Sequence, residues 1–436
     1  MTNQRELERL LDAFLVEGTN ELADRVIDTA MDQIEHTPQR RRLRMPPRFP
    51  TRIMLNRVAA AAFVGLLAVG ATFYLTRPDQ PAVGGPSGSP TTRPSAVPTA
   101  VASPTANAGG TWIETGSMAQ GREGHTATLL RDGRVLVAGG GMTNAASSEL
   151  YDPDVGSWSA TEDMVVARPR MHSATLLPDG QVLVVGGDAG NDAIASAELY
   201  DPGTGTWTAT RNMAEAHGRG HTATLLPDGR VLVAGGFQGD VKLASAELYD
   251  PATGLWSATG RMTAGRAYHT ATLLPDGTVL VAGSVSSVSS AELYDPSTGA
   301  WTATGSMVQG RHDFTATVLP DATVLATAYE GSNTTELYDP STGIWRATGS
   351  MAEPRLGTYT ATLLPSGTVL VVGGVPNEPL RAELYDPRTG TWAAAPDTSV
   401  GRQYGTATLL PNGTVLVAGG RGGSASAELY RPAVGR

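Results

Sequence analysis

The stretch that decides the fold is HTATLLPDGRVLVAGG, residues 221–236. Two short apolar runs flank a Pro-Asp-Gly tripeptide, in which the glycine supplies the positive φ that a tight hairpin requires. The second run ends on paired glycines, which allow two backbones to approach closely. The stretch therefore predicts a β-hairpin, and its run VLVAGG is typical of a strand that is covered on both faces.

This stretch recurs in seven copies between residue 111 and the end of the chain. Each copy is followed by a Glu-Leu-Tyr triplet, and SAELYDPATGLWSATG, residues 245–260, shows that two more short strands follow, hinged at Asp-Pro and Thr-Gly. The triplets begin at Glu149, Glu198, Glu247, Glu292, Glu336, Glu383 and Glu428. Four strands in a unit of about 46 residues predict one blade, so the seven units predict an all-β, seven-bladed β-propeller over residues 111–436.

The units resemble the kelch repeat, in which paired glycines follow an apolar strand and a tyrosine and a tryptophan come next. The resemblance covers residues 111–436 in seven copies, and it implies a galactose-oxidase-like or bacterial kelch propeller. Some copies depart from the pattern. Gly283-Ser284 and Ala328-Tyr329 replace the glycine pair, and Ala322 replaces the turn glycine. We expect these fourth and fifth blades to pack less regularly.

The chain contains no cysteine. Kelch-like copper radical oxidases use a tyrosine that is crosslinked to a cysteine, so the resemblance does not carry that activity to this chain. Disulfides and thiolate metal sites are excluded on the same ground. No histidine pair at metal-ligand spacing, no nucleophile elbow and no calcium loop is found. We therefore expect no cofactor and no catalytic residue, and a binding module is favoured over an enzyme.

The two ends of the repeat region complement each other. The last unit reaches Tyr430 without a following tryptophan, whereas Trp112 near the start has no Glu-Leu-Tyr before it. The interpretation is that the strand around Trp112 becomes the outer strand of the last blade, next to residues 426–430. Backbone hydrogen bonds would then join the two ends and close the ring.

Four regions are expected along the chain, and the propeller is the last of them. Residues 1–52 contain two short amphipathic helices, residues 53–75 an apolar stretch long enough to cross a membrane once, and residues 76–110 a Pro, Ser and Thr-rich linker. Seven arginines and no acid lie between His36 and Arg57. The positive-inside rule therefore places the N-terminus in the cytoplasm and the propeller outside it, on a single-pass membrane protein.

Charge limits the partners of the propeller. Residues 111–436 hold 20 basic and 32 acidic side chains, a formal charge of about −12. An acidic surface disfavours nucleic acid, because phosphates require the opposite field. The expected partner is a protein or a glycan outside the cytoplasm, and the propeller is expected to be monomeric.

Candidate ligand-binding residues lie just before each first strand and in the loops after each glycine pair. Both segments are expected at one mouth of the channel. The candidates are Arg122, His125, Arg170, His172, Asp188, Asn191, Asp192, Arg219, His221, Phe237, Gln238, Lys242, Arg266, His269, Arg311, Arg355 and Arg402. Arginine and histidine together would suit an acidic ligand. The alternative, favoured for the recurring arginines and histidines, is that they bond to loop backbone and keep the blades in register. Seven-fold spacing disfavours a shared metal.

Variation among the copies indicates where a ligand binds. The Pro-Asp-Gly and Asp-Pro turns hardly change, whereas the loops after the glycine pairs differ in every unit, so one face is constrained and the other is free to form a site. The longest loops place the preferred patch at Asp188 to Ile194 and Phe237 to Leu243. The predicted function is a protein- or glycan-binding module. A carbohydrate-acting enzyme with its site at the channel mouth and a membrane-anchored, anti-sigma-like regulator are the alternatives.

Overall fold

The computed structural model describes residues 109–141, 144–189, 192–328, 331–355, 357–374 and 381–433. The predicted cytoplasmic region, the membrane-spanning stretch and all of the linker except its last two residues lie outside these ranges. None of the described segments forms a helix with the length and hydropathy that a membrane crossing requires.

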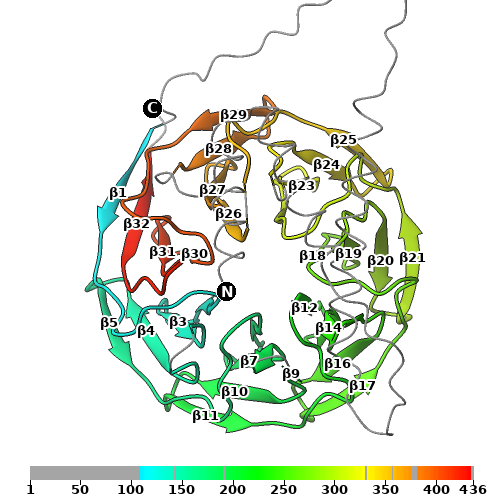
Figure 1. The fold of residues 1–436 in the computed structure, drawn as a ribbon, viewed down its shortest axis with the longest axis horizontal. Coiled ribbons are helices and arrows are strands. Elements are labelled where there is room, and N and C mark those ends of the chain that lie inside the picture. The colour runs from blue at the N-terminus through cyan, green and yellow to red at the C-terminus, as the bar shows by residue number, and fades with distance from the viewer. Residues whose placement is uncertain are drawn as a thin grey trace, which may run out of the picture. The chain divides into compact units, whose positions relative to one another are not determined.

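The described residues form a ring of seven antiparallel, four-stranded sheets around a channel (Figure 1). In each blade the strands run from the channel outward, and the innermost strands of neighbouring blades contact each other. The first four blades comprise β2 (Thr126–Leu129), β3 (Val135–Ala138), β4 (Ser148–Asp152) and β5 (Ser157–Ala160); β6 (Ser173–Leu176), β7 (Val182–Val185), β10 (Ala197–Asp201) and β11 (Thr206–Ala209); β12 (His221–Leu225), β13 (Val231–Gly235), β16 (Ala246–Asp250) and β17 (Leu255–Ala258); and β18 (Thr270–Leu273), β19 (Val279–Ala282), β20 (Ala291–Asp295) and β21 (Ala300–Thr304).

The remaining three blades follow the same order, and two small hairpins rise from the second and third blades. Blades 5 to 7 comprise β22 (Ala316–Val318), β23 (Val324–Ala326), β24 (Glu336–Asp339) and β25 (Ile344–Ala347); β26 (Tyr359–Leu363), β27 (Val369–Gly373), β28 (Glu383–Asp386) and β29 (Thr391–Ala394); and β30 (Thr406–Leu409), β31 (Val415–Ala418), β32 (Ala427–Pro432) and β1 (Gly110–Glu114). The hairpins are β8 (Asp188–Ala189) with β9 (Asp192–Ala193), and β14 (Phe237–Gln238) with β15 (Val241–Lys242).

The last blade combines both ends of the described chain. β1 lies antiparallel to β32, with Trp112 opposite Tyr430 and Gly110 opposite Pro432. The two rings contact each other in a tilted arrangement with their centroids 5.1 Å apart, as the tyrosine and tryptophan of the other blades do.

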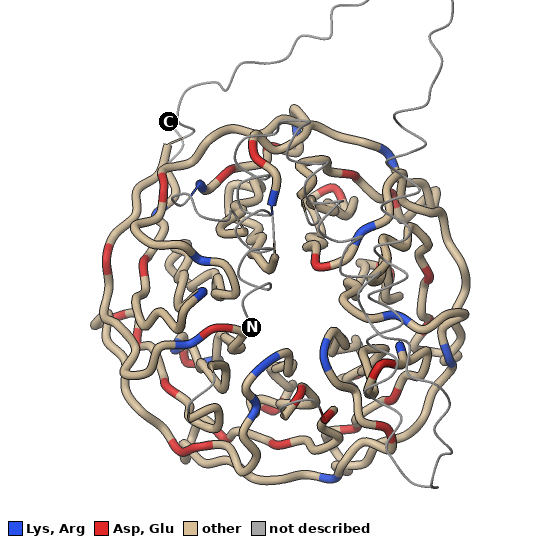
Figure 2. Tube along the Cα trace, in the orientation of Figure 1, with Lys and Arg blue, Asp and Glu red and all other residues tan. Residues whose placement is uncertain are grey.

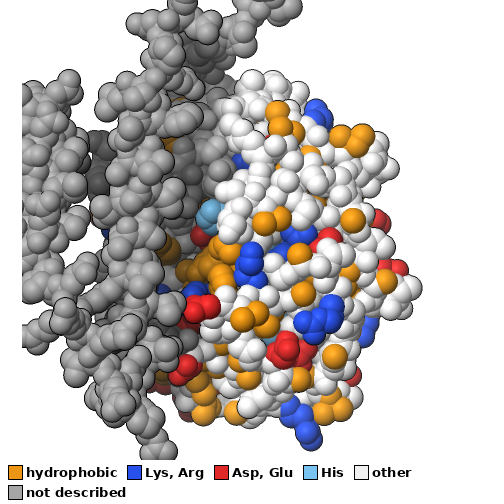
Figure 3. Space-filling model, turned by 45° about the vertical axis from the view of Figure 1, so that its right-hand side comes forward, with side chains coloured by type: hydrophobic (Ala, Val, Ile, Leu, Met, Phe, Trp, Pro, Cys, Tyr) orange, Lys and Arg blue, Asp and Glu red, His pale blue; other side chains and the backbone are white. Residues whose placement is uncertain are grey.

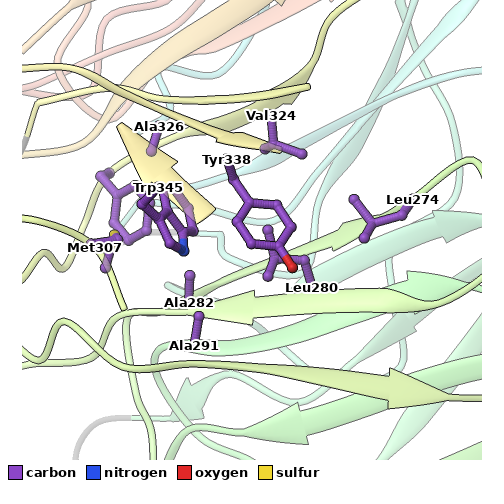
Figure 4. Packing of buried hydrophobic residues seen from close by; sticks show 10 residues of the cluster. Leu274, Leu280, Ala282, Ala291, Met307, Val324, Ala326, Tyr338 and Trp345 are labelled. Atoms are coloured by element: carbon purple, nitrogen blue, oxygen red, sulfur yellow. The ribbon is translucent and has the colours of Figure 1, made fainter. Parts of the chain in front are cut away.

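The hydrophobic core consists of the interfaces between blades. Figure 4 shows one of them, where Tyr338 and Trp345 of blade 5 face Leu280 and Ala282 of blade 4. Tyr338 is fully buried, and its hydroxyl hydrogen-bonds to that of Thr304 in blade 4 at 2.8 Å. Burial of each such side chain stabilises the fold by about 1.5–3 kcal/mol, so the repeated tyrosine holds neighbouring blades together.

The departures from the repeat have a local effect in blade 5. Its strands β22 and β23 have three residues each, and Ala322 in its turn adopts φ 70°, where six other turns place glycine. Blade 4 keeps strands of four and five residues despite Ser284, whose hydroxyl accepts a hydrogen bond from the Ala267 N–H.

Candidate functional site

A cavity of about 710 Å³ occupies one mouth of the channel. Its walls come from the segments that lead into the first strands of five blades and from two of the loops after the glycine pairs. The lining residues are Glu123, Gly124, Pro169, Arg170, Met171, Asp188, Arg219, Tyr268, Tyr404 and Arg421. Three candidates, Arg170, Asp188 and Arg219, are therefore brought together here. Residues of both charge signs border the central opening (Figure 2).

Five of the predicted arginines are not part of this surface, and their assignment to the ligand-binding face is corrected. Each is buried inside its blade and pairs with the glutamate of the Glu-Leu-Tyr triplet at 2.6–3.1 Å. The pairs are Arg122–Glu149, Arg266–Glu292, Arg311–Glu336, Arg355–Glu383 and Arg402–Glu428. A buried guanidinium requires such a partner because isolated charge is strongly disfavoured there. Each of these arginines connects the segment before the first strand of its blade to the third strand of the same blade.

Blades 2 and 3 fill this buried position with other residues. Arg168 pairs with Glu198 at 3.0 Å, and His217 lies 3.5 Å from the Glu247 carboxylate. Both lie four residues before the first-strand histidine of their blade, whereas Arg122 lies three before His125. Arg170 and Arg219 lie only two residues before the same histidines, and both line the channel mouth. Sequence comparison missed this one-residue difference, which was the signal.

The four predicted histidines are buried between blades and are also removed from the ligand surface. Their Nε2 atoms lie within hydrogen-bond distance of a hydroxyl on the preceding blade, as between His269 and Thr222 at 3.1 Å. The others pair His125 with Thr406, His172 with Thr126 and His221 with Ser173. Burial lowers the pKa to about 3 for His125, His172 and His269 and to about 4 for His221. The neutral rings keep the blades in register.

The first glycine of four of the pairs makes room for these histidines. At Gly139 a Cβ atom would lie 2.7 Å from Cε1 of His172 in the next blade, and the residue has φ +65°. Gly235 has the same relation to His269. The glycine pair is thus required by the neighbouring blade as well as by its own turn.

Asp188, Arg219, Phe237 and Tyr268 form one cluster at the mouth. The Arg219 backbone N–H donates to Oδ1 of Asp188 at 2.9 Å, and its guanidinium lies 3.6 Å from the same carboxylate. The guanidinium also lies 5.0 Å from the centroid of the Phe237 ring, a cation–π geometry. Phe237 in turn meets Tyr268 edge to face at 6.2 Å. The cluster fixes the arginine that faces the cavity.

A second charged group lies beside the first, because the Asp188 N–H donates to the Arg170 carbonyl at 3.3 Å. Arg170 Nη2 pairs with Glu123 Oε1 at 3.1 Å, and the other oxygen of Glu123 accepts the N–H of Gly422 at 3.0 Å. Arg421 Nη1 donates to Gln403 Oε1 at 3.2 Å. The guanidinium groups of Arg170 and Arg219 are therefore each matched by a carboxylate, and the cavity offers donors and acceptors side by side.

The hairpin candidates are more distant. Asp192, Gln238 and Lys242 lie on β9, β14 and β15 and do not line the cavity. Asn191 lies outside the described residues. Of the preferred patch, Asp188 lines the cavity and Phe237 supports Arg219.

Seven lining residues were missed from sequence, and one signal could have found three of them. Met171, Tyr268 and Tyr404 each stand directly before the histidine position of their blade (His172, His269 and Gly405), where other blades have glycine, aspartate or threonine. This position varies strongly inside an otherwise constant segment. Glu123 gave no such signal.

The side chains of the described residues do not provide a set of metal ligands. Among the described residues no group of three or more His, Cys, Asp or Glu side chains could hold an ion. The four inter-blade histidines are each engaged by a hydroxyl, and the chain has no cysteine for a crosslinked tyrosine. We therefore derive no chemistry through copper.

Comparison with known proteins supports the fold. The Kelch motif model matches residues 169–214 and 218–263, which contain blades 2 and 3. Among solved structures the chain is similar to a novel fungal alcohol oxidase of the AA5 family, in complex with copper. The two share 19% identity with a TM-score of 0.62, over 74% of this chain and 76% of that chain. No curated protein matches the chain. The chain thus contains Kelch motifs in a seven-bladed propeller, and the likeness to the oxidase concerns the fold alone.

Proposed function

We propose that the propeller is a binding module that takes an uncharged saccharide at the channel mouth. One observation carries the proposal: the cavity combines two tyrosine rings with two Arg–carboxylate pairs, Arg219–Asp188 and Arg170–Glu123. A sugar hydroxyl both donates and accepts hydrogen bonds, so it suits a pair that presents N–H groups and carboxylate oxygens together. The tyrosine rings suit the C–H faces of a sugar ring.

The charge pairing favours a neutral ligand over an anionic one. A phosphate or carboxylate would have to compete with Asp188 and Glu123 for Arg219 and Arg170. A neutral polyol can bond to both members of each pair and leaves their charge balanced.

The outer surface supports the mouth as the site. On the flank shown in Figure 3, acidic and basic side chains are interspersed and form no field of one sign. Large exposed hydrophobic side chains such as Val155, Leu255 and Ile344 stand near the start of the outer strands of three different blades. Single apolar residues of this kind are ordinary on a protein surface.

The test is a glycan array probed with the full chain purified in detergent, with neutral and acidic glycans at equal density. The proposal predicts binding to neutral glycans. Binding to acidic glycans alone would contradict the charge argument, and the absence of any glycan binding would contradict the proposal.

We also propose that the propeller is monomeric and is held outside the cytoplasm by a single membrane crossing at residues 53–75, with residues 1–52 inside. The apolar stretch and the arginines before it support this placement. Extraction of membranes at alkaline pH should leave the chain in the pellet, and its release into the soluble fraction would contradict the anchor.

The β1 strand is proposed to hold the ring closed in solution. Its five residues pair with β32, and Trp112 covers the buried Tyr430. Deletion of residues 110–114 should expose the amides of β32 to rapid hydrogen exchange and broaden thermal unfolding. A deletion variant with unchanged exchange and melting would show that closure does not depend on this strand.

A further inference from the structure

We propose that Tyr268 and Tyr404 are the specificity-determining residues of the channel mouth, held in a strained backbone conformation so that their rings form two platforms for a pyranose. The inference rests on the proposed saccharide function. It adds which side chains select the ring and what keeps them in place.

The position directly before the histidine of each inner strand, or before the residue that replaces this histidine, demands a left-handed backbone. In six of the seven blades this residue has a φ between 50° and 75°. The six are Gly124, Met171, Gly220, Tyr268, Asp313 and Tyr404. Glycine adopts this conformation freely, whereas a bulky residue is a genuine outlier there, with a cost of about 1–2 kcal/mol.

The turns on the opposite face of the propeller provide a comparison, because they do not line the cavity. Each Pro-Asp-Gly-type turn also needs one left-handed residue, and six of seven use glycine with φ 80–95°. Ala322 is the exception. At the mouth, four of the six left-handed residues carry side chains. Residues with a strained backbone are concentrated at functional sites, where the surrounding structure holds them in place.

Backbone hydrogen bonds between blades fix the direction of these side chains. The Tyr268 N–H donates to the Gly220 carbonyl at 2.8 Å, and the Tyr404 N–H to the Thr358 carbonyl at 3.1 Å. The Tyr404 carbonyl accepts the Gly124 N–H at 2.9 Å. The left-handed residues are thus held from both sides, and both tyrosines line the same cavity.

The glycine at the same position in blade 3 makes room for one tyrosine. A Cβ atom on Gly220 would lie 2.6 Å from the Tyr268 nitrogen and 2.9 Å from its ring atom Cδ2. Phe237 supports the Tyr268 ring from another side. The platform is therefore built by three neighbouring elements and does not depend on a ligand to form.

The two platforms suit a pyranose because they present rigid aromatic area from blades 4 and 7 to one cavity. Tyrosine loses little conformational freedom on binding, since it has two side-chain torsions. Burial raises the pKa of Tyr268, and the Asp313 carboxylate adds to this effect. The phenol therefore stays protonated and can both donate to and accept from a sugar hydroxyl.

The test compares Tyr268→Gly and Tyr404→Gly with Ala322→Gly, in the full chain in detergent. All three remove a left-handed side chain, but Ala322 lies on the opposite face. We expect all three to melt within about 2 °C of the wild type, because the relief of backbone strain offsets the freedom that glycine adds to the unfolded chain. Affinity for a neutral glycan identified on the array should fall about tenfold or more for each tyrosine variant and stay unchanged for Ala322→Gly.

Tyr268→Phe separates the ring from its hydroxyl, and it should bind within about threefold of wild type if stacking dominates. A clear fall in melting temperature for both tyrosine variants would indicate a packing role and overturn the inference. So would wild-type affinity in both. Failure of the saccharide function itself would appear differently, as a wild-type chain that binds no glycan.

Discussion

Both faces of the propeller contain positions with a left-handed backbone, but the residue types at these positions differ between the two faces. On the turn face, left-handed residues are glycine with the exception of Ala322, and acidic side chains cap their own turns, as Asp228 accepts the N–H of Arg230. On the mouth face, four of the six left-handed residues that precede the inner strands are tyrosine, methionine or aspartate, and arginines bridge between blades. The mouth face therefore contains backbone strain and charged side chains that the fold itself does not require.

Acid should destabilise the propeller at its mouth face, because all four inter-blade histidines are buried on that side. Their pKa values of about 3 to 4 lie below the unfolded value of 6.5, so the unfolded chain binds more protons between these limits. Stability is complete above pH 6.5 and falls as the pH drops. Below pH 6.5 each histidine lowers the free energy of unfolding by on the order of 1 kcal/mol per pH unit. Urea unfolding followed by tryptophan fluorescence from pH 7.5 to 4.5 measures this slope.

The matched control for the histidines is His269→Phe, which copies Phe314 at the same position of the next blade. The variant should reduce the pH slope by the share of one histidine. An unchanged slope would show that the buried ring is not responsible for acid sensitivity.

The buried Arg–Glu pairs should differ sharply from ion pairs on the turn face. Arg311→Met leaves Glu336 buried and unpaired, which should lower the free energy of unfolding by about 3–5 kcal/mol. Arg134→Met breaks the exposed pair with Asp132 and should change it by less than about 1 kcal/mol. Urea unfolding at pH 7.5 measures both, and equal losses would contradict the assigned roles.

Much of the fold could be predicted because the same pattern occurs in seven copies. The Pro-Asp-Gly turn, the apolar strand and the Glu-Leu-Tyr triplet each predict one local structure, and the agreement of the other copies makes the prediction insensitive to a single exception such as Ala322. The Glu-Leu-Tyr glutamate was not recognised as the partner of the buried arginine, since the two lie 25–30 residues apart in sequence.

The site could be predicted less well because it depends on small differences between copies. Arg170 and Arg122 look equivalent as letters, but Arg170 lies two residues before its histidine and faces the channel, whereas Arg122 lies three residues before its histidine and is buried inside a blade. Histidines that recur near a channel suggest a site, yet their burial follows from the glycines of the neighbouring blade. Tyr268 and Tyr404 are distinguished by backbone conformation, which residue type alone does not reveal.

The central claim, that the mouth and not the turn face binds the saccharide, is tested most directly by two arginines of blade 3. Arg219 and Arg230 have side chains exposed to 36% and 33%, and each pairs with an aspartate, one on each face. Calorimetric titration of Arg219→Met and Arg230→Met with the neutral glycan chosen on the array compares them. We predict a loss of affinity of about tenfold or more for Arg219→Met and none for Arg230→Met. Wild-type affinity in Arg219→Met, or an equal loss in both variants, would contradict the claim.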